Sequence, residues 1–147
     1  MIACRKAKPE DRDLLAALLW ENGMEYVDPA QEYVLALDGT EVVGCARTED
    51  HDEIALVRPV VVARTHRQQG LGRLLVKRVM PADKPTGLVA RGEAIAFYKA
   101  LGFLNAKWKM MPESQQTECE KCPDRKTCQP RPMIFNRNLM KKKDCKK

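Results

Sequence analysis

Backbone N–H groups that can hold an anion are expected at a glycine-rich turn, Arg67-x-x-Gly70-x-Gly72, near the middle of the chain. An apolar run from Pro59 to Ala63 leads into this turn, and the pattern of an amphipathic helix follows it directly. A turn of this kind directs a row of N–H groups and the positive end of a helix toward one point. Glycines leave room for a ligand to approach the backbone closely. The segment therefore predicts a phosphate site, with a strand–turn–helix connection that binds no ligand as the alternative.

Tyr98 carries a phenol group and lies in a second segment, Ala94 to Phe103. The pattern of this segment predicts a short helix followed by a strand. Gly102 suits a left-handed residue at the end of this helix. A tyrosine in such a position, taken by itself, is more often a core aromatic whose hydroxyl is satisfied than a catalytic group. The residues expected on one buried helical face are Ala94, Phe97, Tyr98 and Leu101.

Both segments are similar to signatures of the GNAT superfamily of N-acetyltransferases, in the order found there. The glycine turn resembles the acyl-CoA signature, and A-x-x-F-Y-x-x-L-G-F from Ala94 to Phe103 resembles the second one. The resemblance implies the GNAT acyl-CoA N-acyltransferase fold, an α+β fold whose mixed, mostly antiparallel sheet is covered by helices. It covers residues 1–140 as one domain. It also implies transfer of an acetyl group from acetyl-CoA to a primary amine by direct attack in a ternary complex.

The resemblance assigns roles within these segments. The strand edge before the turn would hydrogen-bond the pantetheine, and the N–H groups of the turn would hold the diphosphate. Tyr98 is the catalytic residue, because the family's tyrosine donates a proton or hydrogen bond to the leaving thiolate. Arg91 stands where the family often has asparagine; a guanidinium cannot accept a hydrogen bond but can pair with a phosphate. The predicted coenzyme residues are Val60, Val61, Val62, Arg67, Gln68, Gln69, Gly70, Leu71, Gly72, Arg73 and Arg91.

The acceptor side is less defined by the sequence. Arg58 lies inside an apolar strand, where it either binds the carboxylate of an amino-acid acceptor in a bidentate way or faces solvent. A chain of waters is one route for the proton of the amine. The candidate general bases are Glu25, Asp28, His51, Asp52 and Glu53.

A cysteine-rich insert at residues 117–130, between the last two expected strands, is not explained by the family pattern. Cys119-x-x-Cys122 has a spacing that lets two thiolates bind one metal ion, and Cys128 is a third ligand. Zinc is the expected metal, an iron–sulfur cluster is the second alternative, and a loop of reduced thiols is the third. Cys145 is the first candidate for a fourth ligand. The others are Cys4, His51, His66 and a residue of a partner subunit.

Composition places few limits on function. The chain has 147 residues, 44% hydrophobic and 31% charged, which suits one globular domain. No apolar run is long enough to span a bilayer, and the N-terminus lacks a secretory core, so a cytoplasmic location is expected. The net charge of +6 comes largely from the basic tail at residues 141–147, with five lysines and one aspartate. Charge therefore does not favour nucleic acid as a partner.

The expected partners are a small-molecule amine or an amino acid, with a homodimer left open. Two alternative functions remain at this point. One is a protein lysine or N-terminal acetyltransferase, and the other is a non-catalytic acetyl-CoA-binding or metal-sensing module.

The elements that would position these residues follow from periodicity and turn signals. Asp38-Gly39 predicts the turn of a hairpin. Residues 24–32 are ambiguous, and residues 49–53 and 81–85 are expected to be loops. The residues expected on the buried face of the first helix are Leu14, Leu15, Leu18 and Leu19. Strands are predicted at 2–7, 33–37, 41–47, 54–63, 86–90, 103–110 and 132–139, and helices at 9–23, 70–80 and 94–101.

Overall fold

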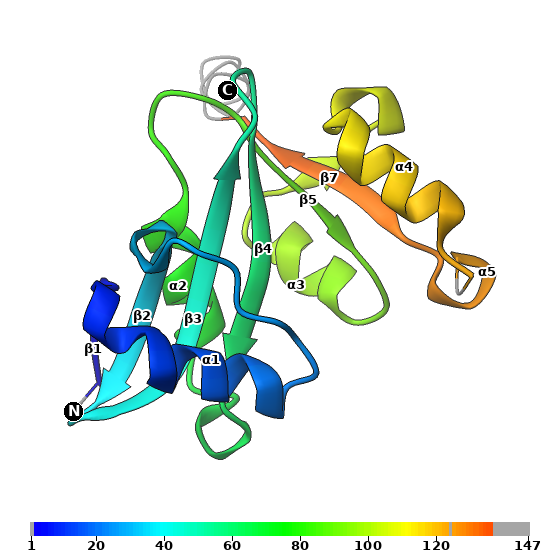
Figure 1. Cartoon of the computed structure of the whole chain (residues 1–147). Coiled ribbons are helices and arrows are strands. Elements are labelled where there is room, and N and C mark those ends of the chain that lie inside the picture. The colour runs from blue at the N-terminus through cyan, green and yellow to red at the C-terminus, as the bar shows by residue number, and fades with distance from the viewer. Residues whose placement is uncertain (1, 124, 137–147) are drawn as a thin grey trace. The chain divides into compact units, whose positions relative to one another are not determined.

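The computed structural model describes residues 2–123 and 125–136, which form two compact units (Figure 1). One unit comprises residues 2–49 and 57–80, and the other comprises residues 50–56 and 81–136. No helix in this described part is both long and apolar enough to cross a membrane.

The first unit contains four neighbouring strands in the hydrogen-bonded order β1-β2-β3-β4, and the β1–β2 and β2–β3 pairs are antiparallel. The predicted hairpin is confirmed, with Gly39 at φ +62° in its turn. The helices and strands are β1 (Ile2–Lys6), α1 (Arg12–Glu21), β2 (Tyr33–Asp38), β3 (Glu41–Asp50), β4 (Ala55–Val62) and α2 (Leu71–Val79). The short 3-10 helices of this unit are η1 (Pro9–Asp11), η2 (Ala30–Glu32) and η3 (Arg64–His66).

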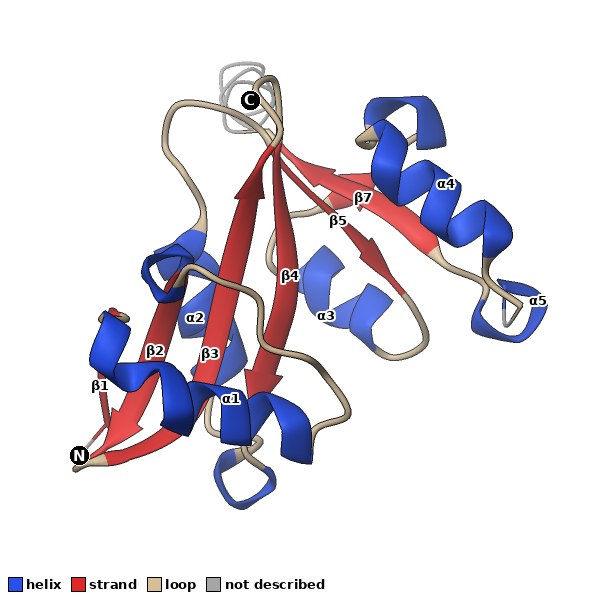
Figure 2. Cartoon of the chain, viewed as in Figure 1, coloured by secondary structure: helices blue, strands red, loops and turns tan. Residues whose placement is uncertain are grey.

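Successive side chains of β2 point to opposite faces of this sheet, and apolar residues on both faces explain why helices cover both. Leu35 and Leu37 pack in one buried cluster with Leu15, Leu18 and Leu19 of α1. Ala36, between them, points to the other face and packs with Leu71 and Leu75 of α2. Figure 2 shows α1 crossing one face of these strands while α2 lies behind them. The sheet of the first unit is therefore buried on both sides.

The chain enters α1 through a carboxylate that is almost fully buried. Asp11 is 8% exposed and accepts hydrogen bonds from the Lys8 backbone N–H at 2.7 Å and from Arg5 Nη1 and Nη2 at 2.7 and 3.0 Å. The bonds from Arg5, more than the backbone N–H of Lys8, lower the pKa of Asp11 to about 2. This carboxylate joins β1 to the start of α1.

The second unit is a smaller sheet in the order β4-β5-β7-β6, using only the first residues of β4. Ala55 and Leu56 pair in parallel with Thr86 and Gly87, whereas β5–β7 and β7–β6 are antiparallel. A buried cluster of Ile54, Leu56, Met111 and Ile134 forms its core. The elements are β5 (Thr86–Ala90), α3 (Ala94–Ala100), β6 (Leu104–Asn105), η4 (Trp108–Met110), α4 (Glu113–Lys121), α5 (Arg125–Cys128) and β7 (Arg131–Phe135).

The predicted strand at residues 103–110 was wrong for most of its length. Only β6 remains, because the next position faces Pro132: Ala106 N–H donates to the Pro132 carbonyl at 3.0 Å, but proline has no N–H to return. The chain leaves the ladder there and turns through η4. Likewise, β7 is shorter than the predicted strand and ends at Phe135; residues 137–139 of that prediction lie outside the described residues.

Other boundaries also differ from the predictions. Strand β3 continues through Glu49 and Asp50, which were expected in a loop. Residues 117–130 are largely helical, since Glu, Gln and Lys favour α4. Residues 24–32 contain only η2. Of the residues expected on buried helix faces, Leu14 is 55% and Phe97 is 37% exposed, and Ala94, Tyr98 and Leu101 are only partly buried.

Candidate functional site

The glycine turn connects β4 to α2 and leaves a row of backbone donors unused. Gln68 and Gly70 adopt φ of +65° and +80°, and Gly70 is the left-handed N-cap of α2. Within the described part of the chain, none of the N–H groups of residues 68–73 donates to a protein acceptor, and the first to do so is Leu74, to the Gly70 carbonyl at 3.1 Å. A Cβ placed on Gly70 would meet no heavy atom within 4 Å. The turn thus offers clustered donors facing open space, as a phosphate site requires.

Two side chains hold this turn in place. Arg67 donates from Nε to the Val62 carbonyl and from Nη2 to Asn22 Oδ1, both at 3.1 Å. His66 Nε2 lies 3.0 Å from Asp38 Oδ2, and this hydrogen bond lowers the pKa of Asp38. Arg67 therefore positions the turn against the end of β4 and the end of α1, and His66 is engaged with a carboxylate.

The strand edge predicted to bind pantetheine lies at the end of β4. Val61 is buried in the cluster that contains α1, whereas Val60 and Val62 are partly buried against the cluster that contains α2. The β4–β5 ladder is formed by Ala55 and Leu56, and the described residues add no pairing with β5 at these three valines.

Tyr98 lies on α3 within an aromatic group of the second unit. Its ring packs edge-on against Phe97 at 5.0 Å and Phe103 at 5.4 Å, and Phe103 is 5.5 Å from Phe135. Burial raises the pKa of Tyr98 to about 12. The predicted helix end is confirmed, with Gly102 at φ +104°. The hydroxyl therefore stays neutral at physiological pH and can donate a hydrogen bond.

The other predicted residues are divided between the two units. Arg91, exposed before α3, has Nη1 4.0 Å from Cys128 Sγ. Glu25 and Asp28 belong to the first unit, in the segment between α1 and β2. In the second unit, the structure brings His51 and Glu53 to one hollow of about 350 Å³, which Lys109 also lines. Asp52, next to them, is exposed and has φ +62°.

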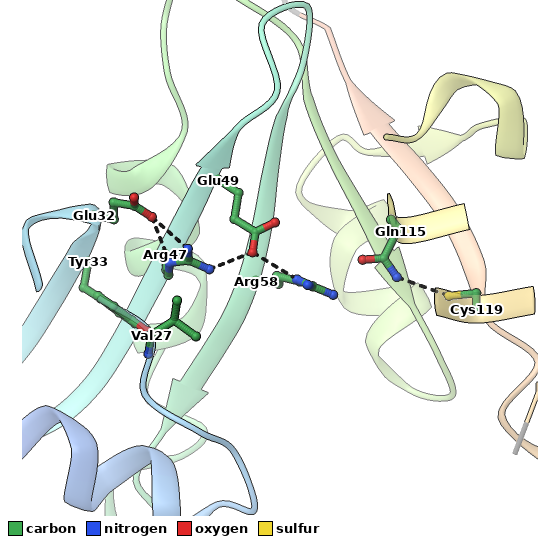
Figure 3. A network of polar contacts seen from close by, with 8 residues as sticks. All are labelled: Val27, Glu32, Tyr33, Arg47, Glu49, Arg58, Gln115 and Cys119. Atoms are coloured by element: carbon green, nitrogen blue, oxygen red, sulfur yellow. Dashed lines mark hydrogen bonds and ion pairs between the residues drawn. The ribbon is translucent and has the colours of Figure 1, made fainter. Parts of the chain in front are cut away.

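A buried arginine network, shown in Figure 3, was not anticipated from the sequence. Arg47 is 7% exposed, contacts Glu32 at 2.9 Å and Glu49 at 2.7 Å, and lies 5.9 Å from the centroid of the Tyr33 ring. Arg58 Nε is 3.3 Å from the same Glu49 oxygen, and its side chain is 44% exposed. The signal in the sequence was a charged residue at the end of an otherwise apolar strand. Its place opposite Tyr33 is set by the register of the folded hairpin, which shifts between Ala36 and Leu37.

The predicted metal site is not supported. The described residues hold no group of three or more His, Cys, Asp or Glu side chains that could bind a metal ion. Cys119 lies in α4 and Cys122 directly follows the end of that helix, while Cys128 lies on α5, near Arg91. Cys145 falls outside the described residues.

Comparisons with known proteins agree with the fold and with the two signatures. A family model described as an acetyltransferase (GNAT) domain matches residues 29–104. An uncharacterised N-acetyltransferase of Chlorobaculum tepidum is 24% identical over 112 residues, covering 74% of this chain and 70% of that protein. Another, YjcF of Bacillus subtilis, is 26% identical over 88 residues, covering 56% of this chain and 63% of that protein.

Among solved structures, the chain is similar to N-acetylglutamate synthase from Neisseria gonorrhoeae in complex with coenzyme A and N-acetyl-glutamate. The TM-score is 0.72 at 14% identity, over 91% of this chain. The chain spans 34% of the length of that synthase, so the likeness concerns one part of the larger protein.

Proposed function

The chain belongs to the GNAT family of acetyltransferases, whose model matches residues 29–104, and on this premise we propose that it transfers acetyl from acetyl-CoA to a small-molecule amine or amino acid. The observation that carries the proposal is the row of unused N–H donors at residues 68–73, inside the matched region. The likeness to a synthase solved with coenzyme A supports the choice of co-substrate.

Residues of the first unit would bind the coenzyme. The N–H groups of residues 68–73 hold the diphosphate, and the dipole of α2 adds to their field. The exposed side chains of Arg64 and Arg73 add positive charge around the turn. The edge of β4 at Val60–Val62 pairs with the pantetheine as with an added strand. These contacts fix the position of the thioester relative to the amine.

Tyr98 acts on the leaving group. The nitrogen lone pair of the amine forms the new C–N bond as the C–S bond breaks, and the electron pair leaves on sulfur. With a pKa of about 12, full proton transfer from Tyr98 to a thiolate of ordinary basicity is uphill by about 5 kcal/mol. Tyr98 is therefore a hydrogen-bond donor that stabilises the developing thiolate, and the proton released by the amine finally neutralises it.

Arg58 is the proposed contact for the acceptor. It lies on β4 two residues before Val60, is partly exposed, and is held through Nε by Glu49. A guanidinium binds a carboxylate in a bidentate way. The synthase with N-acetyl-glutamate offers a precedent for an amino-acid acceptor in this fold.

The test measures coenzyme A release by chromatography with matched acceptor pairs, each an amino acid and the amine that lacks its carboxylate. The wild type is expected to prefer the amino acid, and Arg58→Gln to lose the preference while keeping turnover of the amine. Turnover of peptides alone would identify a protein acetyltransferase. Binding of acetyl-CoA without turnover of any acceptor would contradict an enzymatic role.

A further inference from the structure

The pair Cys119 and Cys122 at the end of α4 has a geometry suited to bond formation between the two sulfurs. Helix α4 ends at Lys121, and the Cys122 N–H donates to the Cys119 carbonyl at 3.4 Å, which is a 3-10 turn. Residues three apart in such a turn lie on one side of the helix, with a rise of about 2 Å per residue. Their Cα atoms are therefore separated by about 6 Å, inside the range that a disulfide spans without backbone movement.

The two thiols differ in a way that separates their roles. Cys122 is exposed, whereas Cys119 is partly buried. Cys119 Sγ accepts a hydrogen bond at 3.2 Å from Nε2 of Gln115, a side chain only 7% exposed (Figure 3). Cys122 can therefore be reached by a reagent in solution, while Cys119 is held beside it as the second thiol.

We propose that Cys119 and Cys122 form a dithiol site that exchanges with low-molecular-weight disulfides. The Cys122 thiolate attacks one sulfur of the disulfide, forms a mixed disulfide and releases one thiolate. Cys119 then attacks the Cys122 sulfur, closes the Cys119–Cys122 bond and releases the second thiolate. The two cysteine protons pass to the two released thiolates, so the chain loses two electrons and the small disulfide gains them.

Cys119 and Cys122 are better placed for this reaction than the other cysteines of the described residues, because they are three positions apart in one turn and neither is buried. Other cysteines of the described chain are less suited: burial raises the pKa of Cys45 to about 12, and burial also raises the pKa of Cys4. Cys128 is on a different helix, near Arg91. The inference does not depend on acetyl transfer.

The experiment treats the reduced full chain, without metal, with oxidised glutathione and measures intact mass and a peptide map. The wild type is expected to lose two hydrogen atoms, to retain no glutathione, and to give a peptide with Cys119 linked to Cys122. Cys119→Ser is expected to stop at a stable glutathione adduct on Cys122. Cys128→Ser, the matched control, is expected to behave as the wild type.

Three results would overturn the inference. One is a persistent glutathione adduct on Cys122 in the wild type, and another is a disulfide that links Cys128 to either residue. The third is loss of the reaction in Cys128→Ser, which would mean that the three cysteines act together. Circular dichroism of each variant establishes that a missing reaction does not arise from unfolding.

Discussion

Arg67 donates a hydrogen bond from Nε to the carbonyl oxygen of Val62, 3.1 Å away, and so fastens the glycine turn to the last residue of β4. The bond from its Nη2 to Asn22 reaches a residue 45 positions earlier in the chain. The family signature places Arg67 beside the coenzyme, and these two hydrogen bonds hold the turn in the chain without a ligand. The two bonds tie the start of the turn that carries the donors of residues 68–73 to β4 and to the residue that follows α1.

Replacing Arg67 with alanine is expected to weaken acetyl-CoA binding about tenfold, or about 1.4 kcal/mol, because the turn loses both anchors. Turnover at saturating coenzyme should change little. Calorimetry checks the affinity. Arg64→Ala is the control, since it removes the same charge from an exposed position in η3. Equal losses in the two variants would show that charge, not position, is what Arg67 supplies.

The two glycines of the turn should respond to alanine with opposite changes in stability. Gly70 has φ +80°, and an L-residue there costs about 1–2 kcal/mol. Gly72 lies within α2, where alanine is favoured over glycine by about 1 kcal/mol. Both methyl groups would crowd the diphosphate, so both variants should bind acetyl-CoA less tightly. Denaturant unfolding and calorimetry measure the two effects, and destabilisation of equal size would contradict the backbone argument.

Tyr98→Phe keeps the ring packing and removes the donor, so kcat should fall about tenfold, or about 1.4 kcal/mol, with little change in acetyl-CoA affinity. Because the pKa of Tyr98 is raised to about 12, its neutral, donating form persists as pH rises. The wild-type rate should therefore not fall between about pH 8 and pH 10 because of Tyr98. The contradicting result is a loss of rate over this range that occurs in the wild type and not in Tyr98→Phe. Such a loss would mean that the hydroxyl ionises near its ordinary value.

Ionisation of Asp11 should make the free energy of unfolding depend on pH in the acid range. Its pKa is lowered from 3.8 to about 2 in the folded chain, so its contribution of about 2 kcal/mol is present above the unfolded pKa and disappears as pH falls through the folded one. Asp11→Asn should reduce the free energy of unfolding by about that amount at neutral pH, and the difference should shrink below the unfolded pKa and vanish only below the folded pKa of about 2. Asp13→Asn, exposed on the same helix, should leave the curve parallel to the wild type.

Features with short-range causes could be predicted from the sequence. The Asp38-Gly39 hairpin, the helix after Gly70 and strand β5 each follow from residues within a few positions. The length of β6 could not, because it depends on Pro132, which becomes its neighbour only in the folded sheet. The Arg47 network likewise depends on hairpin register.

The cysteine-rich segment illustrates a different limit. Spacing indicated a shared ligand for Cys119, Cys122 and Cys128, but spacing does not reveal that a helix end separates the first two from the third. Once α4 is known, the pair and the single cysteine become distinct chemical groups.

The exposure of Cys122 also affects how the enzyme is best assayed. Coenzyme A release is conveniently followed with coloured thiol reagents, and these would also label the protein. The resulting burst of colour would scale with protein concentration and could be mistaken for a first turnover. A blank containing protein without acceptor, or a Cys122→Ser preparation, would separate the protein's own sulfur from the product's.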